Sequence, residues 1–380
     1  MMNISIIRRT PLTTETQKPR EMRAKLVQNK PGFIEAVLPQ RPQRTRRGDT
    51  APTALSSAVK SIPNKLLGFA PERDSASLWL VHRCLLVMLL VALAPLTAFA
   101  QQDKQQQVAG FIKQLKSARV IELNFVWDRN SPLLGLNPPF TLGLQTGHKQ
   151  TKGMIPGGIA FAADMMFFSG QHGAPNIDAL GHISDNMKLF GGLDAAETES
   201  AAGLLKLGIE NYPKERFINR GVLLDVARYK NVDALAPGYE ITAEDLEATA
   251  KAEGIAIQPG DSVLIRTGYG KYFDADKARF TGFRPGPGES AARWIANKKV
   301  FLTGDDQMSY EVVPEKGTVF PCHRILIADN GIYIVENLNL EELARTLAEM
   351  KVFEFVLVLN PPRIRGATGM AANAFAILPQ

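Results

Sequence analysis

The chain has 380 residues, of which 45% are apolar and 22% are charged, so it is long enough and apolar enough to bury a large core. Its formal charge is +6, but the first 83 residues carry 15 Lys or Arg against 6 Asp or Glu, and the remaining 297 carry 29 against 32. A nucleic-acid-binding face needs basic residues clustered on the folded domain, so this distribution argues against a nucleic-acid partner.

The N-terminal part of the chain has the composition of an exported protein's leader. Residues 1–77 have no sustained helical or strand period, and we predict that they are disordered or precede the true start. Residues 78–100 combine Arg83, roughly 15 apolar residues and an Ala98-Phe99-Ala100 ending, as in a signal peptide. A membrane anchor is the alternative, but a span needs about 20 apolar residues. We therefore expect cleavage after Ala100 and a periplasmic or secreted protein without stable membrane association.

Residues 101–380 are expected to form a single domain in which helices and strands alternate. The helices are predicted from capping boxes and apolar residues at helical spacing: 105–118, 242–252, 288–296 and 340–350. The strands are predicted from short apolar runs: 120–126, 159–168, 221–226, 262–267, 300–303, 325–327, 332–335 and 353–359. Asn330-Gly331 indicates a hairpin. This order favours an α/β fold, with a mixed β-sheet or barrel-like core surrounded by helices.

Two further features bear on the domain. The stretch 128–158 is rich in Pro, Gly and Asn, and a loop of that length in a compact domain is usually functional, for example as a lid or pocket wall. The chain has two cysteines, Cys84 and Cys322, and the first lies in the segment that we expect to be removed. No internal disulfide is therefore expected.

Metal-binding and proton-transferring side chains are densest in residues 172–182, directly after the apolar run 159–168, which we expect to be a buried strand. They are His172, Asn176, Asp178 and His182. Imidazole nitrogen and carboxylate oxygen suit a divalent ion such as Zn²⁺ or Mn²⁺. An ion with open coordination positions lowers the pKa of water towards neutrality, which produces a nucleophile for hydrolysis. Two histidines alone would more often be structural residues than ligands.

This motif is similar to the His-x-Gly-Thr-His-x-Asp-x-Pro-x-His signature of the metal-dependent cyclase family, which includes bacterial kynurenine formamidase and isatin hydrolase. The resemblance covers most of residues 118–375. Further matching segments follow in the same order along the chain: 221–225, 259–268, 288–295, 303–306, 323–326, 336–338 and 362–369. The resemblance implies the cyclase fold, a swivelling β/α fold like that of kynurenine formamidase, and a homodimer or homotetramer.

The resemblance also implies roles for individual residues. His172 and Asp178 would be metal ligands, and Asn176 would be a ligand at the position of the family's second histidine. An amide oxygen binds Zn²⁺ less well than imidazole does. The sequence is therefore compatible with either Zn²⁺ or Mn²⁺ as the metal, and with either one or two bound ions.

Three more residues receive roles from the resemblance. His182 would be the general acid/base. His323 and Glu336 would be ligands of a second metal or polar groups around the substrate, brought together by the turn at Asn330-Gly331.

The resemblance favours a hydrolase that acts on carbon–nitrogen bonds, like an arylformamidase or a cyclic amidase. Its substrate would be a small amide, or less favourably a lactone or ester, and could be cyclic or aromatic. The alternative is a catalytically impaired periplasmic binding protein that kept the fold. A serine or cysteine hydrolase is disfavoured, because no Gly-x-Ser-x-Gly elbow is present and consecutive Cys322 and His323 would face apart on a strand.

Overall fold

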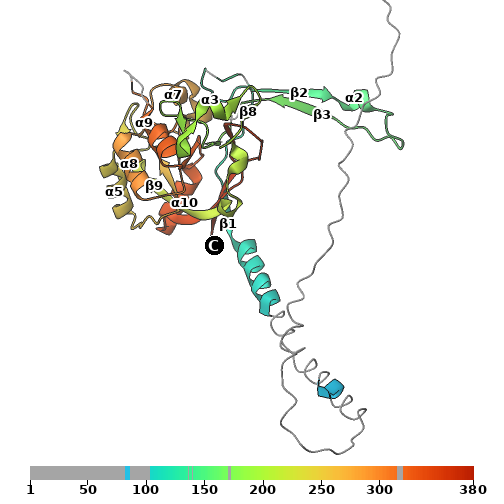
Figure 1. Cartoon of the computed structure of the whole chain (residues 1–380), viewed down its shortest axis with the longest axis horizontal. Coiled ribbons are helices and arrows are strands. Elements are labelled where there is room, and N and C mark those ends of the chain that lie inside the picture. The colour runs from blue at the N-terminus through green and yellow to red at the C-terminus, as the bar shows by residue number, and fades with distance from the viewer. Residues whose placement is uncertain (1–81, 86–102, 136, 139, 170–172, 315–319) are drawn as a thin grey trace, which may run out of the picture. The chain divides into compact units, whose positions relative to one another are not determined.

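A computed structural model describes residues 82–85, 103–135, 137–138, 140–169, 173–314 and 320–380 (Figure 1). The chain divides into two units, Met1–His82 and Arg83–Gln380, and the fold described below is that of the second. The predicted disorder of residues 1–77 and most of the predicted signal peptide lie outside the described residues, and residues 82–85 are helical. In the described ranges, no helix has both the length and the apolar character that a membrane span requires.

A strongly curled, half-barrel sheet of nine strands forms the centre of the domain. Four strands at its middle are parallel neighbours, and the remaining pairs are antiparallel. In spatial order the strands are β1 (Arg119–Glu122), β17 (Ala374–Leu378), β15 (Glu354–Leu359), β9 (Ile218–Asp225), β11 (Ser262–Arg266), β13 (Leu302–Asp305), β14 (Tyr333–Glu336), β4 (Asn176–Asp178) and β16 (Gly369–Ala371). The predicted mixed sheet with helices around it is therefore confirmed.

Helices cover both faces of this sheet, and its central strands accordingly carry buried apolar residues on both faces. Leu223 of β9 packs in one core cluster with α10 (Glu341–Met350). Its neighbour Leu224 packs in a second cluster with α5 (Ala243–Ala252) and α8 (Glu289–Asn297). Successive strand residues point to opposite faces, so the two clusters lie on opposite sides of the sheet.

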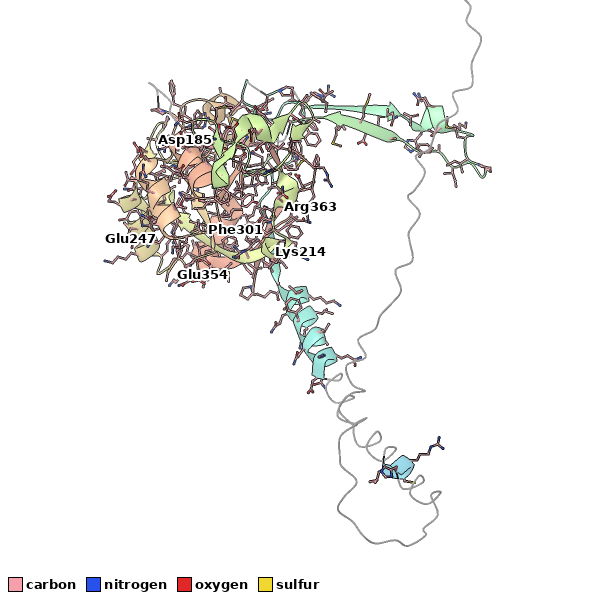
Figure 2. All side chains as sticks on the ribbon, viewed as in Figure 1. Asp185, Lys214, Glu247, Phe301, Glu354 and Arg363 are labelled. Carbon is pink, nitrogen blue, oxygen red and sulfur yellow. The ribbon has the colours of Figure 1, made fainter. Side chains whose placement is uncertain are left out.

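Polar contacts join α5 and α8 on their outer side. Glu247 of α5 lies at the surface of the domain (Figure 2). It accepts a hydrogen bond from Trp294 Nε1 (2.8 Å) and forms an ion pair with Lys298 (3.3 Å). An exposed ion pair of this kind contributes at most about 1 kcal/mol, so the apolar contacts of these helices with the sheet dominate their stability.

The other elements are short and connect the strands. They are β2 (Thr141–Thr146), α2 (His148–Thr151), β3 (Ala163–Phe167), β5 (Lys188–Leu189), η2 (Phe190–Gly192), β6 (Leu193–Asp194), α3 (Ala195–Thr198), β7 (Glu199–Ser200), β8 (Gly203–Leu204), η3 (Ile209–Asn211), η4 (Lys214–Arg216), α4 (Val226–Tyr229), β10 (Glu240–Ile241), α6 (Tyr272–Ala275), α7 (Lys277–Thr281), β12 (Gly286–Pro287), α9 (Pro321–His323) and η5 (Arg324–Asp329). Residues 103–117 are also helical.

Two predictions about apolar runs are wrong. The run 159–168 does not form a buried strand of the sheet. It contains β3, which pairs with β2. Met165 and Phe167 are 64% and 61% exposed, because no other element of the described residues covers this hairpin (Figure 1). The segment 325–327 is not a hairpin strand, since it lies in the π-helical η5 that continues from α9.

The helical start at α9 has a physical cause. Pro321 occupies the first turn, where a missing N–H costs nothing. The Glu311 carboxylate accepts hydrogen bonds from the next two backbone N–H groups, those of Cys322 and His323, both at 2.9 Å. Gly331, with φ +65°, then lies just beyond the end of η5, where the left-handed conformation favours glycine.

A half-buried glutamate at the end of α5 predicts a pH dependence of stability. Glu253 Oε1 accepts a hydrogen bond from the Asp225 backbone N–H (3.2 Å), and burial raises the pKa of Glu253 from 4.5 to about 8. The folded state therefore binds this proton more tightly than the unfolded state, so stability should fall as the pH rises from about 4.5 to about 8. Glu253→Gln should remove this part of the slope in urea unfolding at a series of pH values. The exposed control Glu349→Gln should keep it, and equal slopes in wild type and Glu253→Gln would contradict the prediction.

Candidate metal centre

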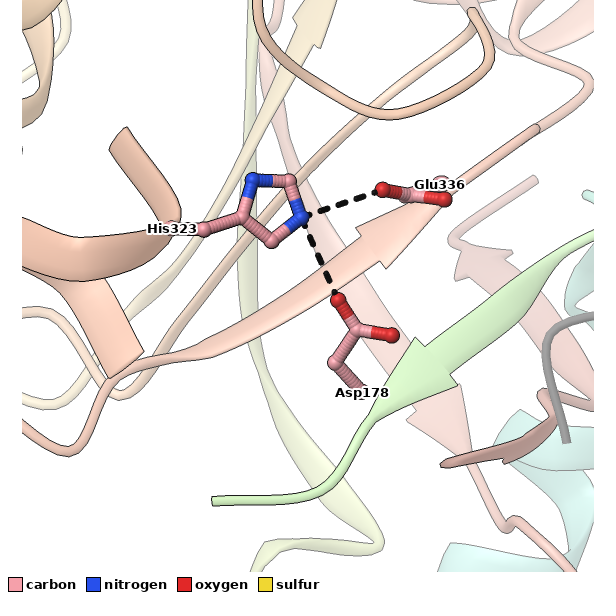
Figure 3. A group of neighbouring side chains, drawn as sticks. All are labelled: Asp178, His323 and Glu336. Carbon is pink, nitrogen blue, oxygen red and sulfur yellow. Dashed lines mark ion pairs between the residues drawn. The ribbon is translucent and has the colours of Figure 1, made fainter. Parts of the chain in front are cut away.

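Three buried side chains converge between α9 and the strands β4 and β14. Ligand atoms of Asp178, His323 and Glu336 all lie within 4.8 Å of one another (Figure 3). His323 Nε2 lies 3.4 Å from Asp178 Oδ2 and 3.4 Å from Glu336 Oε1. Two atoms that bind a tetrahedral ion at about 2.0–2.1 Å stand about 3.4 Å apart, so the residues fit a divalent metal ion.

The sheet register places the two carboxylates. Asp178 ends β4 and Glu336 ends β14, and these strands pair antiparallel with Glu336 opposite Asn176. Asn176 and Asp178 are two residues apart on one strand and therefore share a face. His323 approaches from the end of α9, so it reaches Glu336 from a helix and not across the predicted hairpin.

A fourth buried group, Glu311, fixes the orientation of the imidazole. Glu311 Oε1 lies 2.6 Å from His323 Nδ1 and also accepts the His323 backbone N–H. With Nδ1 donating to Glu311, Nε2 would be the nitrogen that binds an ion held by Asp178 and Glu336. Carboxylate–imidazole–metal arrangements have this form. Glu311 was not predicted, because no local pattern marks a carboxylate that meets a histidine twelve residues away.

The electrostatics of the group also suit a cation. Burial lowers the pKa of His323, but hydrogen bonds with Asp178, Glu311 and Glu336 outweigh burial and hold that pKa well above its usual range. All four residues are at most 8% exposed. Three carboxylates around one imidazole leave a surplus of negative charge in a buried place, and a divalent ion would balance it.

The remaining predicted site residues take different places. His182 Nε2 lies 3.9 Å from Asp178 Oδ1, and its side chain is 27% exposed. Asn176 is fully buried and donates from Nδ2 to Glu336 Oε2 (3.3 Å). His172 lies outside the described residues. The ligand roles of His172 and Asn176 and the acid/base role of His182 stay predictions.

A cavity of about 290 Å³ opens onto this group. It is lined by Asp178, His182, His323 and Glu336 together with mainly apolar side chains: Pro132, Leu133, Leu134, Ile183, Phe273, Met308 and Phe320. Among the described lining residues there is no Lys or Arg. Pockets of this kind bind small ligands, and a few polar groups fix the orientation of the ligand. The predicted pocket-wall role of 128–158 fits its residues 131–134.

A larger groove of about 630 Å³ beside α10 is also present, but its central charges are already paired. Arg266 lies 2.9 Å from both Asp225 and Glu341. The smaller cavity is therefore the better candidate for chemistry, because it joins apolar walls to the buried carboxylate and imidazole group.

Glu311→Gln should weaken binding of a divalent ion by about 10–100-fold, since it removes the charged partner that orients His323. Competition with a chelating indicator dye measures this affinity. Glu253→Gln makes the same change at a residue outside the centre and should bind the ion as wild type does. Unchanged affinity in Glu311→Gln would show that Glu311 does not support a metal site.

The curled mixed sheet and the buried carboxylate and imidazole group define an α/β protein with a candidate metal centre. The chain belongs to the cyclase family, because the family model described as "Putative cyclase" matches residues 115–312. The predicted family is therefore confirmed.

Solved structures share the fold. A structure described as a novel cyclase is 29% identical with a TM-score of 0.63, and the match covers 71% of this chain and 92% of that one. An isatin hydrolase bound to the product analogue thioisatinate is 21% identical with a TM-score of 0.56, over 73% and 99%. Isatin hydrolase A from Ralstonia solanacearum is 19% identical with a TM-score of 0.54, over 72% and 96%. No curated protein matches this chain.

Proposed function

We propose that the protein is a metal-dependent hydrolase that cleaves an amide bond, or a lactone or ester, in a small substrate. The observation that carries the proposal is the buried group of Asp178, His323 and Glu336 at a cavity that His182 also lines. The site thus has a candidate binding site for a divalent ion and, separately, the imidazole of His182 at the cavity that would bind the substrate. Metal-assisted hydrolysis needs both of these parts.

A divalent ion at this place, Zn²⁺ or Mn²⁺, would polarise a substrate carbonyl and lower the pKa of a water molecule. His182 would accept a proton from the attacking water and return it to the leaving nitrogen, since an imidazole works in both directions near neutral pH. Glu311 would hold His323 in the tautomer that directs Nε2 towards the carboxylates.

The cavity suggests the kind of substrate. Its volume of about 290 Å³ and its apolar walls suit a small neutral ring, and its described lining offers no cation for an anionic group. Isatin hydrolases share the fold, so a cyclic amide such as isatin is the first substrate to test. Aryl formamides and lactones of similar size are the next.

We also propose that the mature protein is periplasmic or secreted, after cleavage following Ala100, and that it forms a homodimer or homotetramer. The signal-peptide composition of residues 78–100 supports the first statement, and the family resemblance supports the second. Its partner would be a small-molecule substrate and not a nucleic acid.

The alternative is a binding protein that keeps the cyclase fold without its chemistry, and Asn176 at a family histidine position favours it. Metal analysis after dialysis, combined with a panel of amides, lactones and esters, tests both functions. Stoichiometric Zn²⁺ or Mn²⁺ together with turnover would support the hydrolase. Ligand binding without turnover across the panel would support the binding protein, and absence of metal and of turnover would overturn the proposed enzyme.

A further inference from the structure

Asn176 lies beside the candidate metal centre, and its hydrogen bonds assign it a definite chemical task. Its amide Nδ2 is 3.3 Å from Glu336 Oε2, while the other carboxylate oxygen, Oε1, is 3.4 Å from His323 Nε2. Asn176 therefore contacts one oxygen of Glu336, and the opposite oxygen is directed into the centre. The contact between Asn176 and Glu336 follows from the pairing of β4 with β14, which places these two residues directly opposite each other.

The orientation of the Asn176 amide is set by its two partners. An ionised carboxylate only accepts hydrogen bonds, so the NH₂ group must face Glu336. On its other side Asn176 Oδ1 accepts from Asn337 Nδ2 (2.8 Å). A flipped amide would place oxygen against oxygen at Glu336 and NH₂ against NH₂ at Asn337. The amide therefore has one favourable orientation.

The position of Asn337 is fixed in turn by its backbone. Its backbone N–H donates to the Gln307 carbonyl (3.0 Å), and its φ of +60° is a conformation that asparagine adopts more readily than most residues. The oxygen of Asn176, the one atom through which an amide binds a metal, is thus held by Asn337.

We propose that Asn176 is a positioning residue that donates a hydrogen bond to Glu336 and is not a metal ligand. The proposal rests on the proposed metal centre and is an alternative to the ligand role expected for Asn176 from the sequence motif. The described donor atoms are then those of two carboxylates and one imidazole. Carboxylate oxygen suits Mn²⁺ and Mg²⁺, whereas imidazole suits Zn²⁺. The preference for Zn²⁺ over Mn²⁺ should therefore be smaller in this site than in a site with histidine at position 176.

The variant Asn176→Asp separates the two roles, because they predict opposite signs. If Asn176 were a ligand, a carboxylate of the same shape would add negative charge at the ion and tighten binding. If Asn176 is a positioning residue, the substitution removes the donor and places a like charge against Glu336, so affinity for Mn²⁺ and Zn²⁺ should fall by about 10–100-fold. Asn219→Asp makes the same change in β9 and should leave affinity unchanged.

The measurement is competition between the protein and a chelating dye for Mn²⁺ alone and for Zn²⁺ alone, without any assay of activity. Weaker binding by Asn176→Asp together with wild-type binding by Asn219→Asp supports the proposal, and tighter binding by Asn176→Asp overturns it. If wild type binds neither ion, the proposed function itself fails.

A second measurement does not depend on the folding of a variant. In a crystal structure of wild type loaded with Mn²⁺, Asn176 Nδ2 should remain on Glu336 with Oδ1 outside bonding distance of the ion. A bond of about 2.2 Å from Oδ1 to the ion would overturn the proposal.

Discussion

Asp178→Asn should abolish stoichiometric binding of a divalent ion and, with it, hydrolysis. Asp178 is 1% exposed, and its Oδ2 lies 3.4 Å from the Nε2 atom of His323. The change removes a charged ligand while keeping the shape of the side chain, so the loss of affinity should exceed the 100-fold or so that is typical of residues outside the ligand set.

The fold without metal should survive Asp178→Asn. Three carboxylates surround His323, and the substitution removes the repulsion of the Asp178 carboxylate with the other two. Thermal unfolding with and without Mn²⁺ or Zn²⁺ therefore separates the two effects. Wild type should gain about 2.7 kcal/mol at a metal concentration near 100 times the dissociation constant, and the variant should gain almost nothing.

Asp261→Asn is the matched control. Asp261 is also buried, but it pairs with Arg220 and lies outside the metal group, so this change should affect stability without affecting the gain from metal. An Asp178→Asn protein that binds metal and hydrolyses substrate like wild type would remove the metal centre from the mechanism.

The strands at the middle of the sheet could be predicted from the sequence because their signal is local. β9 and β11 contain the buried apolar runs Val222-Leu223-Leu224 and Val263-Leu264-Ile265, as expected for parallel strands that are covered on both faces. The start of α5 was equally clear, since Thr242 and Asp245 form the capping box that the sequence indicated. These elements need no information from distant parts of the chain.

Segments whose structure depends on distant residues were predicted less well. Ile325-Leu326-Ile327 has the composition of a strand, and an apolar run this short does not distinguish strand from helix. The Glu311 carboxylate at the start of α9 favours the helix. The exposure of β3 likewise depends on its partner strand and not on its own apolar residues.

The site shows the same limit. The motif identified the residues at positions 176 and 178, but the orientation of the Asn176 amide is set by Glu336, which is 160 residues further along the chain. The short strand β16, which pairs with β4 and so completes the sheet next to the site, has only three residues and gave no recognisable pattern. The kind of chemistry could be inferred from residue types, whereas the hydrogen-bond partners of Asn176 and Glu311 could be identified only from the fold.

His182→Ala should lower turnover by about 10²–10⁴-fold while the metal content stays that of wild type. His182 lines the cavity, but its Nε2 is 3.9 Å from Asp178 Oδ1, and it is not among the three residues whose ligand atoms converge. Its imidazole can therefore exchange a proton with water or substrate without holding the ion. Single-turnover kinetics and metal analysis on the same preparation measure both quantities.

His148→Ala is the matched control for this change. His148 is an exposed histidine of α2 outside the lining of the cavity, so its replacement should leave turnover and metal content unchanged. Retained turnover in His182→Ala would exclude His182 as the acid/base. Loss of the ion together with turnover would instead make His182 a ligand, and proton transfer would then require another group at the cavity. Both variants replace a histidine with alanine. A difference in turnover between them is therefore due to the position of His182 at the cavity and not to the loss of a histidine in general.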